Sequence, residues 1–482
     1  MPRHYGKLIA SLAVGALLVG LAAACSQAAK SAPEKAAPQV VVQAGSLQPA
    51  PAAAQLTGWD TPESIRGGLK VVATYDSDGP AAWDPAAHPL VYYTSEGKGY
   101  AHRPSKTDKL PGIQVIDGYT KQVIAAPQYD LGYEKYSTPH QVAASPDGKW
   151  LYTYTNEGDT GAVGTHRLMI INAKTFKLHM ILTTTTPSNA QQRFHHIKAF
   201  KDWQGRDRVL VENQNPNGPK FILDPNDNNR VVRTITMEDV GSGFGHPNSS
   251  IGPDGKTLFI ALRMPGDWGD RINGAIGKFD LEKGTIKYVT GVGIHPNGMA
   301  HTSDGKFTYV NDSSGSRVYK IDNAKNEIVG STQAGVSGPY SLALNWDETE
   351  LWTVGKGEGG SHNTGGVLGV IDTKTFSPTN KIDQPVAIGG SIMDHAFLHP
   401  DPKVNELWVS SAGTWETIVV DLNTYKVKAR IPSPHGGDTH SGSFVRYKPD
   451  FTGEVLFDQG GPLATMRATM KANAEKLAAA KP

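Results

Sequence analysis

A short polar turn recurs along this chain, and its regular spacing constrains the fold more than any other feature of the sequence. The clearest copies share the tripeptide Asp-Gly-Lys, at Asp147-Gly148-Lys149, Asp254-Gly255-Lys256 and Asp304-Gly305-Lys306. Looser copies lie at Trp203-Gln204-Gly205, Asp347 and Asp401. Neighbouring copies are roughly forty to sixty residues apart, which is the spacing of a chain built from one repeated structural unit.

Two segments of high β propensity follow each turn. Residues 257–261, for example, lead through a polar loop to residues 274–280, which end in Asp. Short strands bounded by turn residues and repeated in this way predict an all-β fold, a β-propeller of seven blades. Two terminal segments, residues 69–73 and 443–447, are left over. They either close the ring within a shared blade or form an eighth blade, and closure would leave no open edge strand.

The N-terminus has the features of a processing segment. A basic start precedes an apolar run from Leu8 to Ala24, and Cys25, the only cysteine of the chain, follows it directly. This arrangement resembles the lipobox of bacterial lipoproteins, in which the cysteine carries the lipid. The resemblance implies a signal peptide over residues 1–24 and a periplasmic protein that is lipidated at Cys25. Ser26 after the cysteine favours attachment to the outer membrane.

The rest of the chain divides by composition. Residues 25–66 are rich in Ala and Pro and are expected to form a flexible tether. Residues 67–462 contain the repeats and are expected to form the propeller. Residues 463–482 consist of helix-forming residues and are expected to be a short solvent-facing helix or a disordered tail.

Composition also excludes several kinds of chemistry. If Cys25 carries lipid, no thiol remains, which excludes disulfides, cysteine-ligated metals and thiol catalysis. No Cys-x-x-Cys-His motif is present, so a covalently attached c-type haem is excluded. The 47 Lys and Arg balance the 46 Asp and Glu, which argues against a nucleic-acid partner. Contact with a membrane is expected through the lipid anchor only.

Histidines precede most of the turns at nearly the same position. The strand before each turn is the innermost strand of a propeller blade, so these histidines are expected to gather at one mouth of the central channel. The predicted metal ligands are His140, His196 (with His195 as an alternative), His246, His295, His395 and His440. A set of imidazoles without thiolates favours copper or haem iron. The candidate catalytic residues near this mouth are His295, His301 and Asp394.

Two family resemblances support the repeat. Residues 145–152, Ser-Pro-Asp-Gly-Lys-Trp-Leu-Tyr, are similar to the repeat of the YVTN-type β-propellers. Within that group the chain most resembles the haem-d1 propeller of the cytochrome cd1 nitrite reductases, through residues 200–208, 293–298 and 389–409.

The cytochrome cd1 resemblance implies a haem d1 cofactor. By position, His140 matches the proximal iron ligand and His295 matches one distal histidine. The second distal histidine has no counterpart, and Tyr340 and Asn345 stand near its place. That departure, together with the missing c-haem motif, counts against nitrite reduction. A membrane-anchored d1-haem biosynthesis protein in the same family is a propeller without a c-type haem.

A further resemblance favours copper. Residues 304–312 are similar to a blade of nitrous oxide reductase, whose propeller holds a multinuclear copper centre with a ring of histidines. Thiocyanate-oxidising propellers use related copper sites. The chain lacks the second, copper-binding domain of nitrous oxide reductase, because it has neither the length nor the cysteines for it.

Three functions therefore stand at this point. The first is a membrane-anchored redox metalloprotein that holds copper, acts on a small inorganic sulfur or nitrogen anion and exchanges electrons with a c-type cytochrome. The second is a haem-d1-binding propeller. The third is a non-enzymatic binding scaffold, since propellers commonly serve binding.

Overall fold

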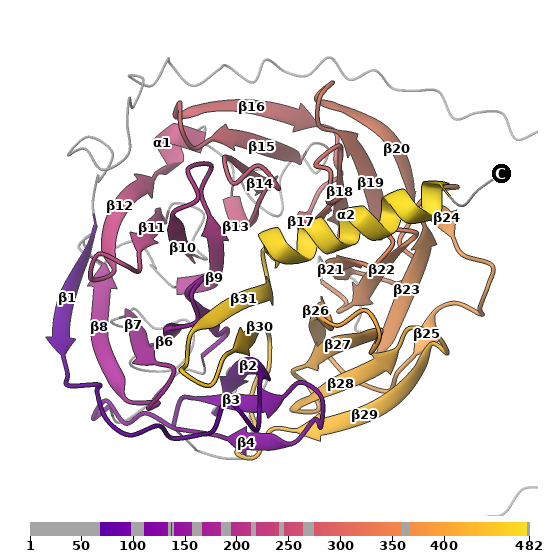
Figure 1. The fold of residues 1–482 in the computed structure, drawn as a ribbon. Coiled ribbons are helices and arrows are strands. Elements are labelled where there is room, and N and C mark those ends of the chain that lie inside the picture. Colours follow the sequence, from indigo (N-terminus) through magenta and orange to yellow (C-terminus); the bar gives the residue numbers. More distant parts are fainter. Residues whose placement is uncertain are drawn as a thin grey trace, which may run out of the picture. The chain divides into compact units, whose positions relative to one another are not determined.

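The computed structural model describes residues 68–97, 110–133, 136, 139–156, 166–184, 194–213, 218–240, 245–263, 274–358 and 366–479. All of them belong to one compact unit. Their strands form seven sheets, which stand as blades around a central axis (Figure 1). The prediction of an all-β, seven-bladed propeller is confirmed, and the described strands leave none over for an eighth blade.

Five blades are built from consecutive strands, ordered from the axis outward. The second blade contains β9 (Phe194–Lys201), β10 (Asp207–Asn213), β11 (Lys220–Asp224) and β12 (Arg230–Ile235), followed by the short helix α1 (Met237–Val240). The third contains β13 (Gly245–Ile251), β14 (Thr257–Arg263), β15 (Ala275–Asp280) and β16 (Thr285–Thr290). The fourth contains β17 (Pro296–His301), β18 (Phe307–Asp312), β19 (Arg317–Asp322) and β20 (Glu327–Gln333). The fifth contains β21 (Pro339–Leu344), β22 (Glu350–Gly355), β23 (Val367–Asp372), β24 (Ser377–Pro378) and β25 (Val386–Ala387). The sixth contains β26 (Met393–Leu398), β27 (Glu406–Ser411), β28 (Glu416–Asp421) and β29 (Lys426–Pro432).

The two remaining blades take up the terminal strands. In the first, the order from the axis is β5 (Ala143–Ala144), β6 (Trp150–Asn156), β7 (His166–Asn172), β8 (Leu178–Thr184) and β1 (Leu69–Thr74). The seventh joins the two ends of the propeller, in the order β32 (Gly461–Pro462), β31 (Gly453–Asp458), β30 (Gly442–Tyr447), β2 (Leu90–Glu96), β3 (Gly112–Asp117) and β4 (Val123–Ala125). The antiparallel pairing of β30 with β2 closes the ring.

The recurring Asp-Gly-Lys sequence has a local cause in the turns. Gly148, Gly255 and Gly305 all adopt a positive φ, of 71°, 62° and 71°, which a residue without Cβ does at no steric cost. In each turn the preceding Asp accepts a hydrogen bond from the backbone N–H of the following Lys. Each turn therefore connects an innermost strand to the next strand of its blade.

Aromatic packing holds the closing blade against the sixth blade. Trp408 on β27 is fully buried, and its ring centroid lies 5.3 Å from that of Tyr92 on β2 and 5.1 Å from that of Phe444 on β30. The ring centroids of Tyr92 and Phe444 lie 4.7 Å apart. Aromatic pairs at these distances add to the burial of their large surfaces, so ring closure rests on side chains as well as on strand pairing.

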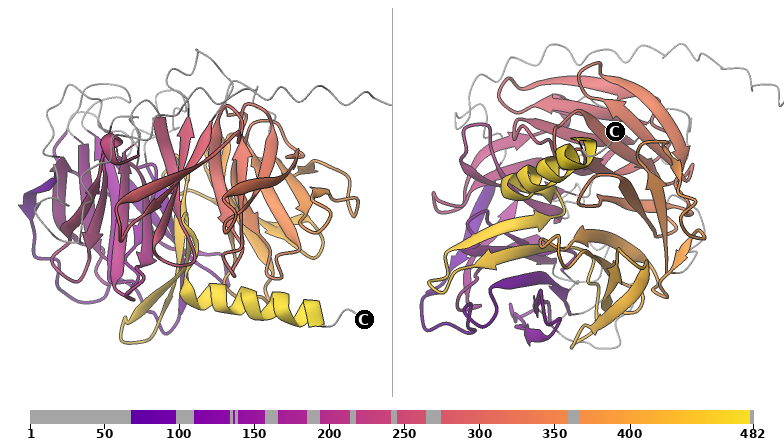
Figure 2. Two further views of the ribbon diagram at one scale, coloured as in Figure 1. Left: turned by 90° about the horizontal axis from the view of Figure 1, so that it is seen from above. Right: turned by 45° about the vertical axis from the view of Figure 1, so that its right-hand side comes forward.

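The C-terminal segment covers one face of the propeller. Strands β31 and β32 form a hairpin, and the helix α2 (Ala464–Ala479) then lies along this face of the disc (Figure 2). A short C-terminal helix was predicted, but the helix is not wholly solvent-facing, because Met466 and Met470 are buried. None of the helices in the described residues is long and apolar enough to cross a membrane.

Candidate metal centre

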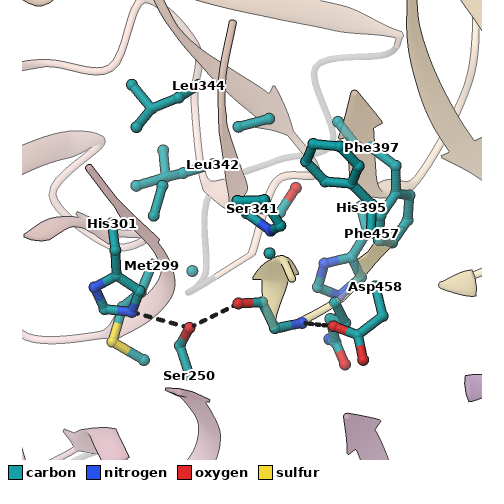
Figure 3. Close-up of a pocket in the computed structure, with 18 of the residues that line it drawn as sticks. Ser250, Met299, His301, Ser341, Leu342, Leu344, His395, Phe397, Phe457 and Asp458 are labelled. Atoms are coloured by element: carbon teal, nitrogen blue, oxygen red, sulfur yellow. Dashed lines mark hydrogen bonds between the residues drawn. The ribbon is translucent and has the colours of Figure 1, made fainter. Parts of the chain in front are cut away.

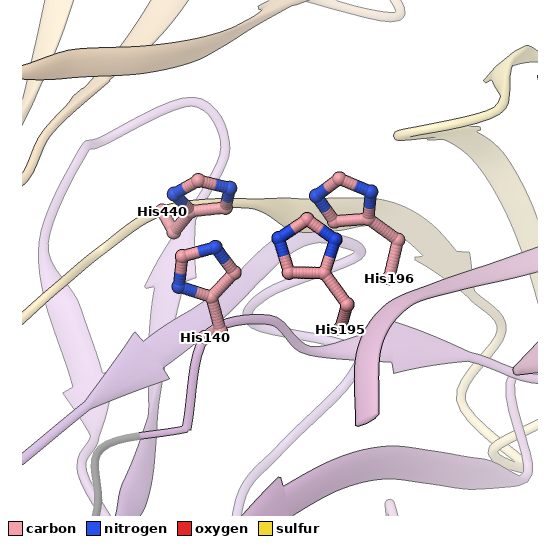
Figure 4. Close-up of side chains that lie close together, drawn as sticks. All are labelled: His140, His195, His196 and His440. Carbon is pink, nitrogen blue, oxygen red and sulfur yellow. The ribbon is translucent and has the colours of Figure 1, made fainter. Parts of the chain in front are cut away.

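Four histidines meet near the axis of the propeller. His140, His195, His196 and His440 are all buried, and each can offer a ring nitrogen such that all four nitrogens lie within 4.8 Å of one another (Figure 4). The rings of His140 and His440 stack with centroids 3.4 Å apart, and those of His195 and His196 are 3.6 Å apart. We refer to these four residues as the histidine cluster. Three of them are predicted ligands, and His195 was the alternative to His196.

A β-bulge brings two neighbouring histidines to the same site. Residues on a regular strand point alternately to opposite faces, so His195 and His196 would diverge. The pairing of β9 with β10 shifts register between Val211 and Asn213, so that both histidines stand opposite the single residue Glu212. An extra residue of this kind re-aims side chains, and here both imidazoles reach the cluster.

The same bulge recurs on the other innermost strands. Asp394 and His395 stand opposite Ser410, and Tyr340 and Ser341 occupy the same place on β21. The repeat therefore presents a pair of adjacent residues to the axis from each of these blades. The sequence repeat showed where these residues recur, but the turn spacing gave no sign of the register shift.

Three buried carboxylates lie against ring nitrogens of the cluster. The Nδ1 atom of His440 is 3.0 Å from Asp394 Oδ2, that of His140 is 3.4 Å from Asp438 Oδ2, and that of His196 is 3.7 Å from Glu212 Oε2. These acidic side chains are at most 1 % exposed. Carboxylates at this position orient a metal-binding imidazole and raise its basicity. Asp394 was predicted as catalytic, whereas Asp438 and Glu212 were not among the predicted site residues.

Burial favours the neutral form of His196 and His440 in the cluster and of His395 beside it. Loss of hydration lowers the pKa of His196 and of His440 well below the ordinary value of 6.5, and neighbouring imidazoles lower both further. Burial also lowers the pKa of His395 well below that value. A neutral imidazole keeps a free lone pair, which is the form that binds metals.

The surroundings of the cluster carry further buried charges. Glu212 forms ion pairs with Lys198 and with Lys220, whose Nζ atom is 2.6 Å from Glu212 Oε1, and all three side chains are fully buried. On the other side, Lys356 Nζ lies 2.6 Å from Asp394 Oδ1 and 3.6 Å from the centre of the Tyr340 ring. None of the three lysines was predicted, because lysine is usually exposed.

His395 lies beside the cluster but outside the group of four. Its ring centroid is 4.9 Å from that of His440 and 5.5 Å from that of His196. Its Nε2 atom, however, is 2.8 Å from Nε2 of Gln459, at the tip of the C-terminal hairpin. His395 therefore contacts both the cluster and the C-terminal hairpin.

The remaining predicted histidines lie elsewhere or cannot be placed. His295 lies outside the cluster, because it precedes β17, whose bulge holds Asn297 and Gly298 instead. His301 hydrogen-bonds with Thr308 and Ser250 at the other end of β17. The backbone of His246 belongs to β13, but its side chain lies outside the described residues. Cys25 also lies outside them.

The fold and this site define a seven-bladed β-propeller with buried histidines at its axis. No protein-family model matches the chain, and no curated protein matches its sequence. Among solved structures, a protein from Lactobacillus plantarum is similar, with 13% identity and a TM-score of 0.51 over 72% of this chain and 98% of that chain.

Two further solved structures resemble the chain. One is the dihydro-haem d1 dehydrogenase NirN, with 14% identity and a TM-score of 0.49 over 83% of this chain and 77% of that chain. The other is the hydrazine synthase of Kuenenia stuttgartiensis, with 17% identity and a TM-score of 0.44 over 68% of this chain and 98% of that chain. At these identities the likeness concerns the propeller fold alone.

Proposed function

We propose that this propeller is a redox metalloprotein that holds copper at the histidine cluster. The observation that carries the proposal is the convergence of four buried imidazoles whose ligand nitrogens lie within 4.8 Å of one another. Each ligand nitrogen of a metal site sits roughly 2 Å from the metal, so neighbouring ligand nitrogens are separated by no more than about 4 Å. The cluster needs only a small adjustment to meet this condition.

The ligand set favours copper among the transition metals. Imidazole nitrogens suit copper, zinc, nickel and iron, and the affinity of such a site among divalent ions peaks at Cu²⁺. With Nδ1 directed at a carboxylate in His140, His196 and His440, we assign their Nε2 atoms to the metal. Nε2 of His440 also lies 3.4 Å from the Tyr340 hydroxyl, which copper would have to displace. Bound copper would supply one-electron redox chemistry. The protein would orient the imidazoles and exclude bulk water.

The packing of the rings favours a metal ion over haem d1. An axial haem ligand needs one open side toward a flat macrocycle. The ligand nitrogen of His140 instead lies within 4.8 Å of ligand nitrogens from His195, His196 and His440, where a macrocycle would have to fit. His295, the second residue that the haem interpretation requires, is not in the cluster. Haem d1 therefore stands as the alternative that the test must separate.

The substrate class follows from the size and surroundings of the cluster. A compact site among buried side chains suits a small inorganic species, and we assign it a sulfur or nitrogen anion whose electrons pass to a c-type cytochrome. The buried ammonium groups of Lys198 and Lys356 are already paired with carboxylates, so the positive charge of the bound metal would supply the attraction for a negative species. We also propose periplasmic, lipid-anchored attachment through Cys25, tested by whether Cys25→Ala releases the protein from the membrane fraction.

Metal analysis with an absorption spectrum tests the copper proposal. Protein purified from its host, or loaded with Cu²⁺ and dialysed, should retain stoichiometric copper with nitrogen couplings in its electron paramagnetic resonance spectrum. The double variant His140→Asn/His440→Gln should lose at least nine-tenths of the bound copper. The control His88→Gln removes a part-exposed histidine that pairs with Asp117 and should leave the copper content unchanged.

The same experiment separates the alternatives. Long-wavelength haem bands without copper would replace the proposal by the haem d1 function. A colourless protein that takes up neither cofactor would leave the non-enzymatic binding scaffold as the remaining function. Equal copper contents in the wild type and the double variant would show that the cluster is not the site.

A further inference from the structure

A cavity lies between the innermost strands and the C-terminal hairpin with its helix, and Figure 3 draws residues that line it. Both polar and apolar side chains line it. Strands β13, β17, β21 and β26 form its walls, and residues 457–462 with Arg467 and Met470 of α2 cover it. His395 lines the cavity and also adjoins the cluster.

We propose that this cavity binds a small neutral organic molecule with an apolar body and an amide or hydroxyl head. The site is separate from the histidine cluster, and the inference does not rest on the presence of a metal.

The hydrogen-bonding groups of the cavity indicate the head of the ligand. Ser341 is 5 % exposed, and no hydrogen-bond partner is found in the described residues for its hydroxyl or for the side-chain carbonyl Oε1 of Gln459. Both residues line the cavity. A buried polar group without a partner costs free energy, which a ligand could recover by donating to Oε1 of Gln459 and accepting from the Ser341 hydroxyl.

The other polar groups of the cavity are already engaged. Asp458 accepts hydrogen bonds from the backbone N–H groups of Ala199 at 2.5 Å and Gly460 at 2.6 Å. The ring of His301 is 2.8 Å from Thr308 Oγ1 and 3.0 Å from Ser250 Oγ (Figure 3 shows the second contact). These contacts fix the walls of the cavity and leave the neutral groups of Ser341 and Gln459 to recognise a ligand.

Apolar side chains and the balance of charge indicate the body of the ligand. The apolar lining comes from Met299, Leu342, Leu344, Phe397, Phe457 and Met470. Asp458 and Arg467 both line the cavity, but each is already hydrogen-bonded to two backbone groups, so neither is left to pair with a charged ligand. An uncharged body packed against these walls needs no counter-ion and gains from the burial of its apolar surface.

A matched pair of probes tests the proposal. Benzamide and benzoate have nearly the same shape, but only benzamide can donate a hydrogen bond to Gln459 Oε1. Calorimetric titration of the metal-free protein should show benzamide binding in the millimolar range or tighter, with benzoate at least tenfold weaker. Ser341→Ala and Gln459→Leu should each weaken benzamide binding about fivefold to tenfold, the effect of one hydrogen bond.

Controls keep the outcome independent of folding. Ser377→Ala, on the exposed β24, should bind benzamide like the wild type, and unfolding temperatures should show that each variant is folded. No benzamide binding, equal binding of benzoate, or unchanged binding in both cavity variants would overturn the proposal. Because the protein is metal-free, none of these results depends on the copper site.

Discussion

His140 and His440 come from opposite ends of the propeller, yet their rings stack with centroids 3.4 Å apart. His140 precedes the innermost strand of the first blade, and His440 precedes β30, which pairs with β2 to close the ring. The cluster therefore forms only when the two ends of the propeller meet. The site and the closure of the fold depend on one another.

The carboxylates behind the cluster should set its affinity for metal. Asp394→Asn and Asp438→Asn replace acceptors that lie 3.0 and 3.4 Å from the Nδ1 atoms of His440 and His140. Without such a partner the imidazole is held less firmly and is less basic. We therefore expect each variant to bind copper about 10- to 100-fold more weakly. Competition with a chelator of known affinity measures this. Asp383→Asn, at an exposed position, is the control, and equal affinities in all variants would contradict the assigned role.

The buried ion-pair group around Glu212 should be sensitive to loss of its only carboxylate. Glu212 pairs with both Lys198 and Lys220, and all three side chains are fully buried. Glu212→Gln leaves two buried ammonium groups without their counter-ion, and we expect the free energy of unfolding to fall by about 3–5 kcal/mol. Urea denaturation measures the change.

A surface ion pair provides the contrast. Glu282 pairs with Lys256 near solvent, and Glu282→Gln should cost less than about 1 kcal/mol. Similar losses for Glu212→Gln and Glu282→Gln would show that the buried group does not carry the stability assigned to it.

The architecture could be predicted from the sequence because it depends on local signals. Each Asp-Gly-Lys turn needs a positive φ at its glycine, and the flanking strands have the length and β propensity of a blade. The placement of His140 and His196 at the axis followed from the turns after them, and that of His440 from its position before the last inner strand. These features repeat, so each copy supports the others.

The rest of the site depends on contacts that have no local signal. The bulge that brings His195 and His196 to the same site is a register shift between two strands, and no residue type in the sequence predicts it. Asp438 and Glu212 lie far from their histidine partners in sequence or on a neighbouring strand. His295 lies outside the cluster, because the bulge of its blade holds Asn297 and Gly298.

Trp408 should be important for ring closure. It is fully buried between Tyr92 on β2 and Phe444 on β30. Trp408→Ala leaves a large cavity where the sixth and seventh blades meet, and we expect a loss of about 3–5 kcal/mol in unfolding free energy. Tyr75→Ala, at a side chain that is 46% exposed, should change it by no more than about 0.5 kcal/mol. Equal effects in urea denaturation would show that closure does not rest on this aromatic group.

His301 should make stability depend on pH. Burial lowers its pKa to about 3, whereas the unfolded chain has the ordinary value of 6.5. Between these values the unfolded state binds a proton that the folded state does not, so the free energy of unfolding falls as pH is lowered. The slope is about 1.4 kcal/mol per pH unit, which gives about 3 kcal/mol between pH 7.5 and 4.5. Above pH 6.5 both states are neutral and the contribution is constant. His301→Gln removes the titrating group, so the difference in stability between wild type and variant should shift by this amount in urea denaturation at the two pH values. Parallel pH profiles for the two proteins would show that His301 takes up its proton equally in both states.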